Sequence, residues 1–166
     1  MSAWIVGLLM TSSARAECAE AASADSLLAI LAAGESALTS ANVAKMPEQI
    51  QAAREQAAAV LPCVTEPIPL SLAARYHRVD GLRLFVEQQA DVAALSFAAS
   101  RRLEPDAQLP LDDAHPIQAL FRQEDLTSHP DEALAQPAEG RIQIDGQDSL
   151  VRPEGLPVIF QHFSAD

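Results

Sequence analysis

Histidine, cysteine and paired aspartate side chains are the groups in this sequence that could support catalysis or bind a metal. The four histidines lie far apart and in different predicted elements, at His77, His115, His129 and His162. Metal ligands recur at short spacings, which these do not. Asp112 and Asp113 stand near His115 as acid–base partners would, but a cap on the following helix explains them better. Because the sequence also lacks a nucleophile elbow and a phosphate-binding glycine loop, we predict no catalytic site, no metal and no cofactor.

The N-terminus has the pattern of an export signal. The apolar residues 4–10 precede the polar residues 11–13 and an A-x-A site at 14–16, which predicts cleavage after Ala16. No Lys or Arg precedes the apolar run, and a start codon placed too late would explain this. We predict that residues 1–16 are a bacterial signal peptide and that the protein acts in the periplasm or cell envelope, or is secreted. A cytosolic protein with an apolar first helix is the alternative.

Cys18 and Cys63 are the only cysteines, and an even number in an exported protein favours a disulfide. If residues from about 20 to 40 and from about 47 to 61 form an antiparallel helix pair, the first helix begins beside the end of the second. The two cysteines then meet, so we predict a Cys18–Cys63 disulfide. In a cytosolic protein both would be reduced thiols.

The chain is strongly acidic, with 11 basic and 23 acidic residues and a net charge of −12. Removal of residues 1–16 would take away Arg15 and no acid, leaving −13. Such a charge repels nucleic acid phosphates and anionic lipid headgroups, so we expect no nucleic acid partner. No segment approaches the roughly 18 apolar residues that span a bilayer, so we expect no integral membrane span. Two explanations fit this acidic charge. The simpler one is that it keeps the protein soluble, and the other is that it attracts a basic partner.

Apolar residues at three- and four-residue intervals predict helices in four segments. The clearest members of each face are Leu27 and Leu31, Ile50 and Ala57, Leu72 and Val79, and Val92 and Leu95. Pro47 suits a first helical turn and Pro62 ends its helix. Residues 115–121 predict a short capping helix, which begins at Pro116.

Four residues in the second half of this helical region have the mutual spacing of one helical repeat: Gly81, Ala93, Phe97 and Pro105. Residues 74–107 resemble a tetratricopeptide repeat. In that family the glycine lies where two helices pack closely, the small and aromatic residues lie in the second helix, and the proline ends it. Residues 24–62 could be a degenerate partner repeat. The resemblance implies about two stacked helical hairpins that bind another protein. A generic helical bundle is the alternative.

Several basic side chains surround the first helix of this repeat. The resemblance implies a concave, partly basic groove that takes a peptide or an acidic segment of a protein partner. Tyr76, Arg78 and Arg83 are the candidate contacts of that groove. A solvated face, with the arginine stems packed on apolar surface, is the simpler explanation.

The composition changes after residue 125. Residues 126–140 predict a linker, because helix breakers and small polar residues dominate. Residues 141–163 predict a small β module, with strands at 141–145, 149–151 and 156–163 and a tight turn at Asp145–Gly146. A module of three short strands is only marginally stable alone. We therefore expect it to dock on the helices or on a partner. Its exposed edge could accept a strand from another protein.

These features together predict a mainly α protein with helical hairpins resembling tetratricopeptide repeats over residues 17–125 and a small C-terminal β module. The expected function is a non-catalytic, exported protein–protein interaction scaffold. A structural accessory subunit built permanently into an envelope complex is one alternative, and an enzyme of unrecognised type is another. The sequence indicates neither the partner nor the oligomeric state.

Overall fold

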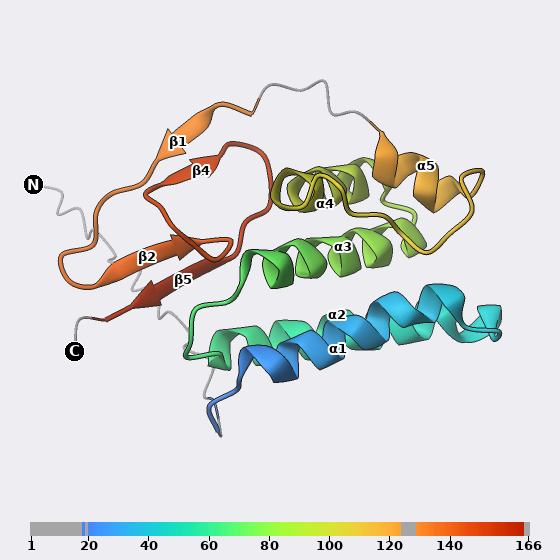
Figure 1. The fold of residues 1–166 in the computed structure, drawn as a ribbon, viewed down its shortest axis with the longest axis horizontal. Helices are drawn as coiled ribbons and strands as arrows, with labels where there is room; N and C mark the ends of the chain where they lie inside the picture. Colours follow the sequence, from blue (N-terminus) through green and yellow to red (C-terminus); the bar gives the residue numbers. More distant parts are fainter. Residues whose placement is uncertain (1–17, 19, 124–128, 165–166) are drawn as a thin grey trace, which may run out of the picture.

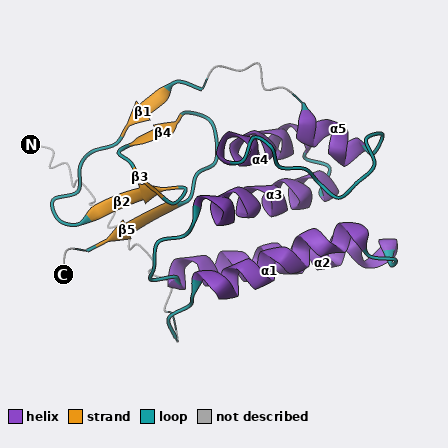
Figure 2. Cartoon of the chain, in the orientation of Figure 1, coloured by secondary structure: helices purple, strands orange, loops and turns teal. Residues whose placement is uncertain are grey.

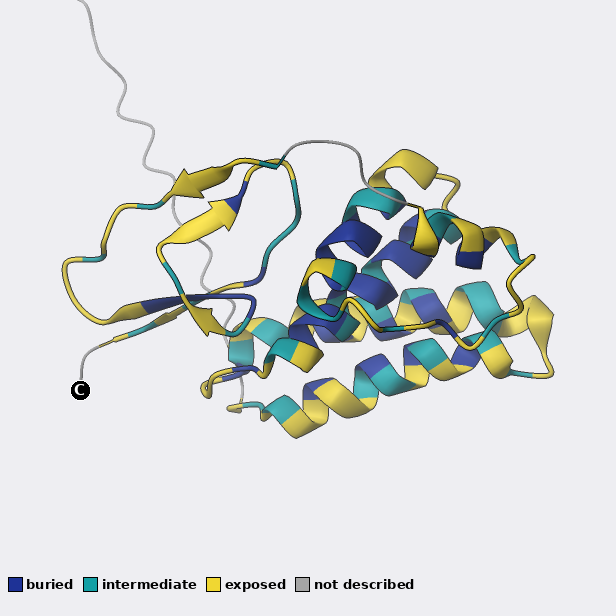
Figure 3. Ribbon diagram, turned by 45° about the horizontal axis from the view of Figure 1, so that its top comes forward, coloured by how far each residue is buried: buried dark blue, intermediate teal, exposed yellow. Residues whose placement is uncertain are grey.

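The computed structural model describes residues 18, 20–123 and 129–164. In these ranges the chain forms five α-helices, with the strands gathered to one side of them (Figures 1 and 2). The predicted mainly helical chain with a small C-terminal β module is therefore confirmed. The helices are α1 (Ala24–Ser36), α2 (Met46–Val60), α3 (Leu70–Val86), α4 (Ala90–Leu103) and α5 (Pro116–Arg122). Buried residues fall on their inward faces (Figure 3).

Helices α1 and α2 form the first hairpin. The Ser23 hydroxyl accepts a hydrogen bond from the Ser26 backbone N–H at 3.2 Å and so caps α1. Leu27 and Leu31 are fully buried. Pro47 lies in the first turn of α2 as predicted, where its missing N–H costs nothing.

A disulfide joins Cys18 to Cys63, as the sequence predicts. It ties the segment before α1 to the turn that ends α2. Beside it, the Ala22 N–H donates to the Cys63 carbonyl at 2.8 Å, and Ala22 forms a parallel bridge with Val64. The disulfide therefore fixes the start of residues 64–69, which connect the first hairpin to α3 and which we call the joint.

Helices α3 and α4 pack closely where Gly81 faces Phe97. A Cβ at Gly81 would lie 2.5 Å from the Phe97 ring, so only glycine fits this contact. Ala93 and Phe97 are fully buried, and Pro105 follows the end of α4 at Leu103. Gly81 and Phe97 therefore set how closely α3 and α4 approach each other.

Helix α5 closes the open end of this pair. Its Phe121 is buried against Phe97, with ring centroids 5.3 Å apart in an edge-to-face arrangement. The predicted cap by Asp112 and Asp113 is wrong, because His115 Nδ1 accepts from the Ile117 N–H at 3.2 Å.

The β module contains two small sheets. The first pairs β1 (Asp131–Ala133) with β4 (Val151–Pro153), and the second has the order β3–β2–β5, from β3 (Gln147–Asp148), β2 (Arg141–Ile144) and β5 (Phe160–Phe163). The turn at Asp145–Gly146 has positive φ at both residues, 51° and 82°, as the predicted hairpin requires.

Two predicted boundaries in the C-terminal part differ from the structure. Strand β1 lies inside residues 126–140, which the sequence predicts to be a linker; of that range, 126–128 lie outside the described residues. Residue Val151, predicted to return beside β2, pairs with Ala133 instead. Strands of two or three residues carry too little alternation to be detected from sequence.

The β module docks on the helices through the tip of its hairpin. Asp145 Oδ1 lies 2.9 Å from His77 Nε2 on α3, and both side chains are buried. Gly146 packs against the backbone before α3, where an added Cβ would lie 2.3 Å from the Ile68 carbonyl oxygen. Of the two docking modes that the sequence left open, the structure shows docking on the protein's own helices.

Candidate partner-binding site

The three residues predicted to contact a partner do not share one face of α3. Tyr76 and Arg83 lie seven positions apart and therefore on the same side of the helix. Arg78 lies on the opposite side. The structure thus brings two of the three candidates together and separates the third.

Tyr76 and Arg83 belong to a charged cluster between α2, α3 and α4. Asp80 accepts from Arg54 Nε at 2.6 Å and from the Ser96 hydroxyl at 3.0 Å, and Arg83 Nη2 lies 3.5 Å from it. The Arg54 guanidinium lies 4.7 Å from the Tyr76 ring centroid. Burial raises the pKa of Tyr76 above its ordinary value, against the opposing effect of Arg54. These groups satisfy one another within the fold.

Arg78 is buried, which corrects the prediction that it contacts a partner at the surface. Its side chain is 8% exposed and joins two acids, Glu35 at 2.8 Å and Glu104 at 2.6 Å. Burial lowers the pKa of this guanidinium, but hydrogen bonds to Glu104 and Glu35 outweigh that effect and raise it overall. Arg78 therefore holds α1, α3 and the end of α4 together.

A groove of about 520 Å³ opens above this ion pair, between α1, α3 and the segment after α4. Of the three predicted groove contacts, Arg78 lines it, but Tyr76 and Arg83 do not. Glu35 pairs with both arginines that line it, Arg75 at 3.0 Å and Arg78. Because acids and bases there neutralise one another, the groove offers no net charge to an acidic segment.

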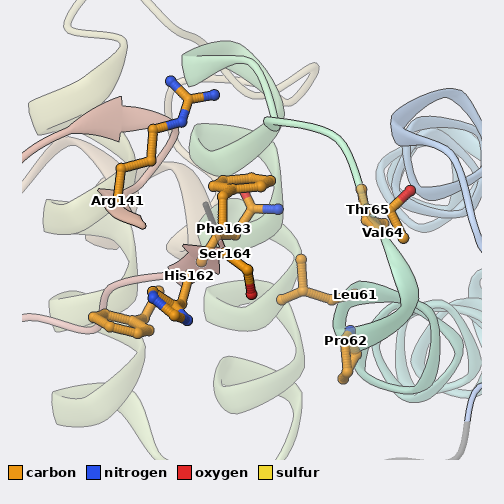
Figure 4. Close-up of a pocket in the computed structure, with 10 residues that line it drawn as sticks. Leu61, Pro62, Val64, Thr65, Arg141, His162, Phe163 and Ser164 are labelled. Atoms are coloured by element: carbon orange, nitrogen blue, oxygen red, sulfur yellow. The ribbon is translucent and has the colours of Figure 1, made fainter. Parts of the chain in front are cut away.

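A larger cleft, of about 620 Å³, runs along β5, and we call it the β5-edge cleft. One wall is the end of α2 and the joint before α3, and the other is β5 with its neighbour Arg141 on β2. Figure 4 shows these two walls facing each other. The cleft is lined by Leu61, Pro62, Val64, Thr65, Arg141, Phe160, Gln161, His162, Phe163 and Ser164. Its volume falls in the range of about 300–1,000 Å³ that is usual for ligand pockets.

The pairing of β5 with β2 decides which backbone groups face this cleft. The Asp145 N–H donates to the Ile159 carbonyl at 2.8 Å, and this pair continues the β2–β5 register. In an antiparallel pair, every second residue exchanges hydrogen bonds with the partner strand. Gln161 and Phe163 therefore direct their backbone groups toward β2.

Phe160 and His162 consequently direct their N–H and C=O groups away from β2. In the described part of the chain, no other strand pairs with this side of β5 and no backbone hydrogen bond reaches these two residues. Phe160 is 54% exposed as a residue, although aromatic residues are more often buried. Strand β5 thus presents an unpaired edge beside a cleft.

Gln161 fixes the distance between the two walls. Its Nε2 donates to the Glu66 carbonyl at 3.1 Å, and its Oε1 accepts from the Ile68 N–H at 3.1 Å. The opposite wall is held by the Cys18–Cys63 disulfide, since Cys63 lies between lining residues. Both walls are therefore anchored before any ligand binds.

The histidines do not converge on one site. His77 contacts Asp145, His115 caps α5, and His129 Nδ1 and His162 Nε2 each lie within 3.0 Å of a backbone carbonyl oxygen. Among residues 18, 20–123 and 129–164, no group of three or more His, Cys, Asp or Glu side chains could hold a metal ion. Within the same ranges, no helix is long and apolar enough to cross a membrane.

Comparisons with protein-family models, curated proteins and solved structures find no match for this chain. The tetratricopeptide resemblance of residues 74–107 therefore stays a prediction. The predicted signal peptide, residues 1–16, lies outside the described residues.

Sequence reasoning proposed an exposed strand edge of the β module as a binding surface, but it did not predict the β5-edge cleft beside that edge. On the two walls, Pro62 indicated the end of a helix and residues 156–163 indicated a strand. Their meeting depends on the contact between His77 and Asp145, which are 68 positions apart. No local pattern reports such a contact.

Proposed function

We propose that this protein is a non-catalytic, exported protein–protein interaction scaffold of the bacterial periplasm or cell envelope, and that it binds its partner in the β5-edge cleft. The observation that carries the proposal is the unpaired backbone of Phe160 and His162 beside that cleft. An exposed strand edge presents unpaired N–H and C=O groups, and an extended peptide pairs with them by adding a strand.

The fold supports this use of the edge. Strand addition works best when the receiving edge is already rigid, because less conformational entropy is lost on binding. Here Gln161 fastens β5 to the joint, and the disulfide fastens the joint to the segment before α1. A disulfide also fits an oxidising compartment such as the periplasm.

Site-specific photo-crosslinking tests the proposal. Phe160 is replaced by the photoreactive aromatic residue p-benzoylphenylalanine, and the mature protein is irradiated with the envelope fraction of its native cells. Val43 is the matched control position, because it is 71% exposed and lies at the far end of the first hairpin (Figure 1). We expect a discrete protein adduct from position 160 that position 43 does not give. Identical adducts from both positions, or none from position 160, would refute the proposal.

A further inference from the structure

We infer that the segment bound in the β5-edge cleft is an extended strand of a partner protein that carries an Asp or Glu side chain, and that this carboxylate pairs with Arg141. The inference rests on the proposed function and adds the chemistry of the partner to it. It is argued from the charge of the cleft, the free donors of Arg141 and the place of Arg141 on β2, next to the last residue of β5.

The cleft differs in charge from the rest of the protein. None of its ten lining residues is acidic, although the chain has 23 acidic and 11 basic residues. Arg141 and His162 are the lining residues that can carry positive charge. An acidic protein would repel an acidic segment elsewhere on its surface, so this local difference favours binding of a negative group here.

The contacts of Arg141 hold its side chain in position but leave some of its hydrogen-bond donors free. Its Nη1 donates to the Asp148 carboxylate, with distances of 3.1 and 3.3 Å, and its guanidinium lies 5.2 Å from the Phe163 ring centroid. Half of the side chain is exposed. In the described ranges no hydrogen bond reaches its Nε or Nη2, so these donors remain for a second carboxylate.

The location of Arg141 sets where the acidic residue must be. Arg141 pairs with Phe163 in the β2–β5 register, so its side chain lies at the C-terminal end of β5, next to Phe163 in Figure 4. A strand that hydrogen-bonds to Phe160 and His162 has a fixed register along β5. Its acidic residue should therefore occupy one constant position, at the end of the segment beside Phe163.

A side chain is the better source of this carboxylate than a chain terminus. Terminal carboxylates in proteins are captured by clusters of backbone N–H groups. Here the free backbone groups of β5 are spaced along an extended strand. The cation is a side chain of β2, on the other side of β5, which the carboxylate reaches across Phe163. We therefore commit to an Asp or Glu within a continuing segment.

A peptide selection tests the inference. A library of random octapeptides, displayed with both ends fused so that no terminus is free, is selected against the mature protein. Selected sequences are then made with blocked termini, each with a counterpart in which Asp or Glu becomes Asn or Gln. Their affinities are measured by calorimetry for the unchanged protein, for Arg141→Gln and for Arg152→Gln. Arg152 is the matched control, because it is 45% exposed, pairs with Glu132 and lies on β4.

We expect selected peptides to share an acidic residue at one position. Arg141→Gln should weaken their binding by about three- to fivefold at low salt, which is the scale of a half-exposed ion pair. It should not change binding of the neutral counterparts, and Arg152→Gln should change neither. Added salt should reduce the difference.

Two results would overturn the inference, and they differ in what else they refute. In the first, the peptides protect the amides of β5 from hydrogen exchange without an acidic preference, or the two arginine variants bind them equally. The predicted partner chemistry is then wrong, and the cleft remains a binding site. If no peptide binds, or if peptides bind away from β5, the inference and the proposed function both fail.

Discussion

Tyr76 is the only tyrosine of the chain, so its ionisation can be followed without interference from another phenol. Burial raises its pKa above the ordinary value of about 10. The unfolded chain therefore releases this proton at lower pH than the folded protein does. Stability from this source is complete below about pH 10 and is lost as the pH rises through the folded-state pKa.

The first prediction follows from that sign. The ultraviolet absorbance of tyrosinate should develop at higher pH in the folded protein than in denaturant, and Tyr76→Phe should lessen the loss of stability above pH 10. Denaturant midpoints measured from pH 8 to 12 check the second part. A folded-state titration at the ordinary value would contradict the assigned burial.

The second prediction concerns Arg78 and Arg83, both of which the sequence predicts to contact a partner. Arg78→Met leaves Glu35 and Glu104 without their common partner, so we expect a loss of about 3 kcal/mol in the free energy of unfolding. Arg83→Met removes a partly exposed pair with Glu87 on the same helix and should cost under about 1 kcal/mol. Urea denaturation measures both, and equal losses would show that Arg78 does not join the three elements.

Helical spacing already argues against the prediction that Tyr76, Arg78 and Arg83 contact one groove, since Tyr76 and Arg78 lie two positions, or about 200°, apart on the helix. It was not sufficient to predict what Arg78 contacts. Its acidic partners lie 43 and 26 positions away, on other elements. The burial of a charge therefore became visible only once the helices were packed.

At the scale of elements, the hairpin tip holds the β module to the helices. Gly146→Ala should disturb this contact, because the new Cβ would lie 2.3 Å from the Ile68 carbonyl oxygen at a φ of 82°. Gly155→Ala is the matched control: its φ is 78°, but the nearest atom would lie at 3.5 Å. We expect backbone strain to lower the free energy of unfolding by about 1–2 kcal/mol in both variants. Only Gly146→Ala should lose more than this.

Amide hydrogen exchange would locate the effect of these two substitutions. In the Gly146→Ala variant, β2 and β5 should exchange faster while α3 and α4 stay protected, since stability differs between parts of a fold. Uniform acceleration in both variants would mean that the hairpin tip is not a separate docking contact.

The disulfide is the second link between elements, and its removal gives the fourth prediction. Cys18 and Cys63 are 45 positions apart, and closing such a loop stabilises by about 4 kcal/mol in the chain-entropy model. Replacing both with Ser should lower the free energy of unfolding by that order. The unchanged protein under a reducing agent should match the double variant, and an unchanged denaturation midpoint would contradict the assignment.

Helices and turns with strong local patterns were predictable from sequence. Short strands that exist only because they pair with a distant strand were not. Leu27 and Leu31 show helical spacing, and Asp145–Gly146 is a specific turn, so α1 and the β2 hairpin were found. Strands β1 and β4 have three residues each, and their pairing depends on where the chain returns.

At the scale of the whole molecule, the β5-edge cleft joins three parts of the chain: residues 61–65, Arg141 and residues 160–164. The sequence suggested the exposed edge of the β module as a binding surface, but not the cleft that these parts form together. They meet because the disulfide, the Gln161 contacts and the His77–Asp145 contact hold them together. The cleft is therefore a property of the fold, which is why sequence reasoning suggested a free strand edge but not the cleft beside it.

Amide hydrogen exchange of the four β5 residues, followed by NMR without and with a bound partner segment, tests the central claim most directly. In the free protein, Gln161 and Phe163 should exchange slowly because they bond to β2, and Phe160 and His162 should exchange fast. On binding, Phe160 and His162 should become protected by at least tenfold, about 1.4 kcal/mol in opening free energy. Binding that leaves these two amides as fast as before would contradict strand addition at this edge.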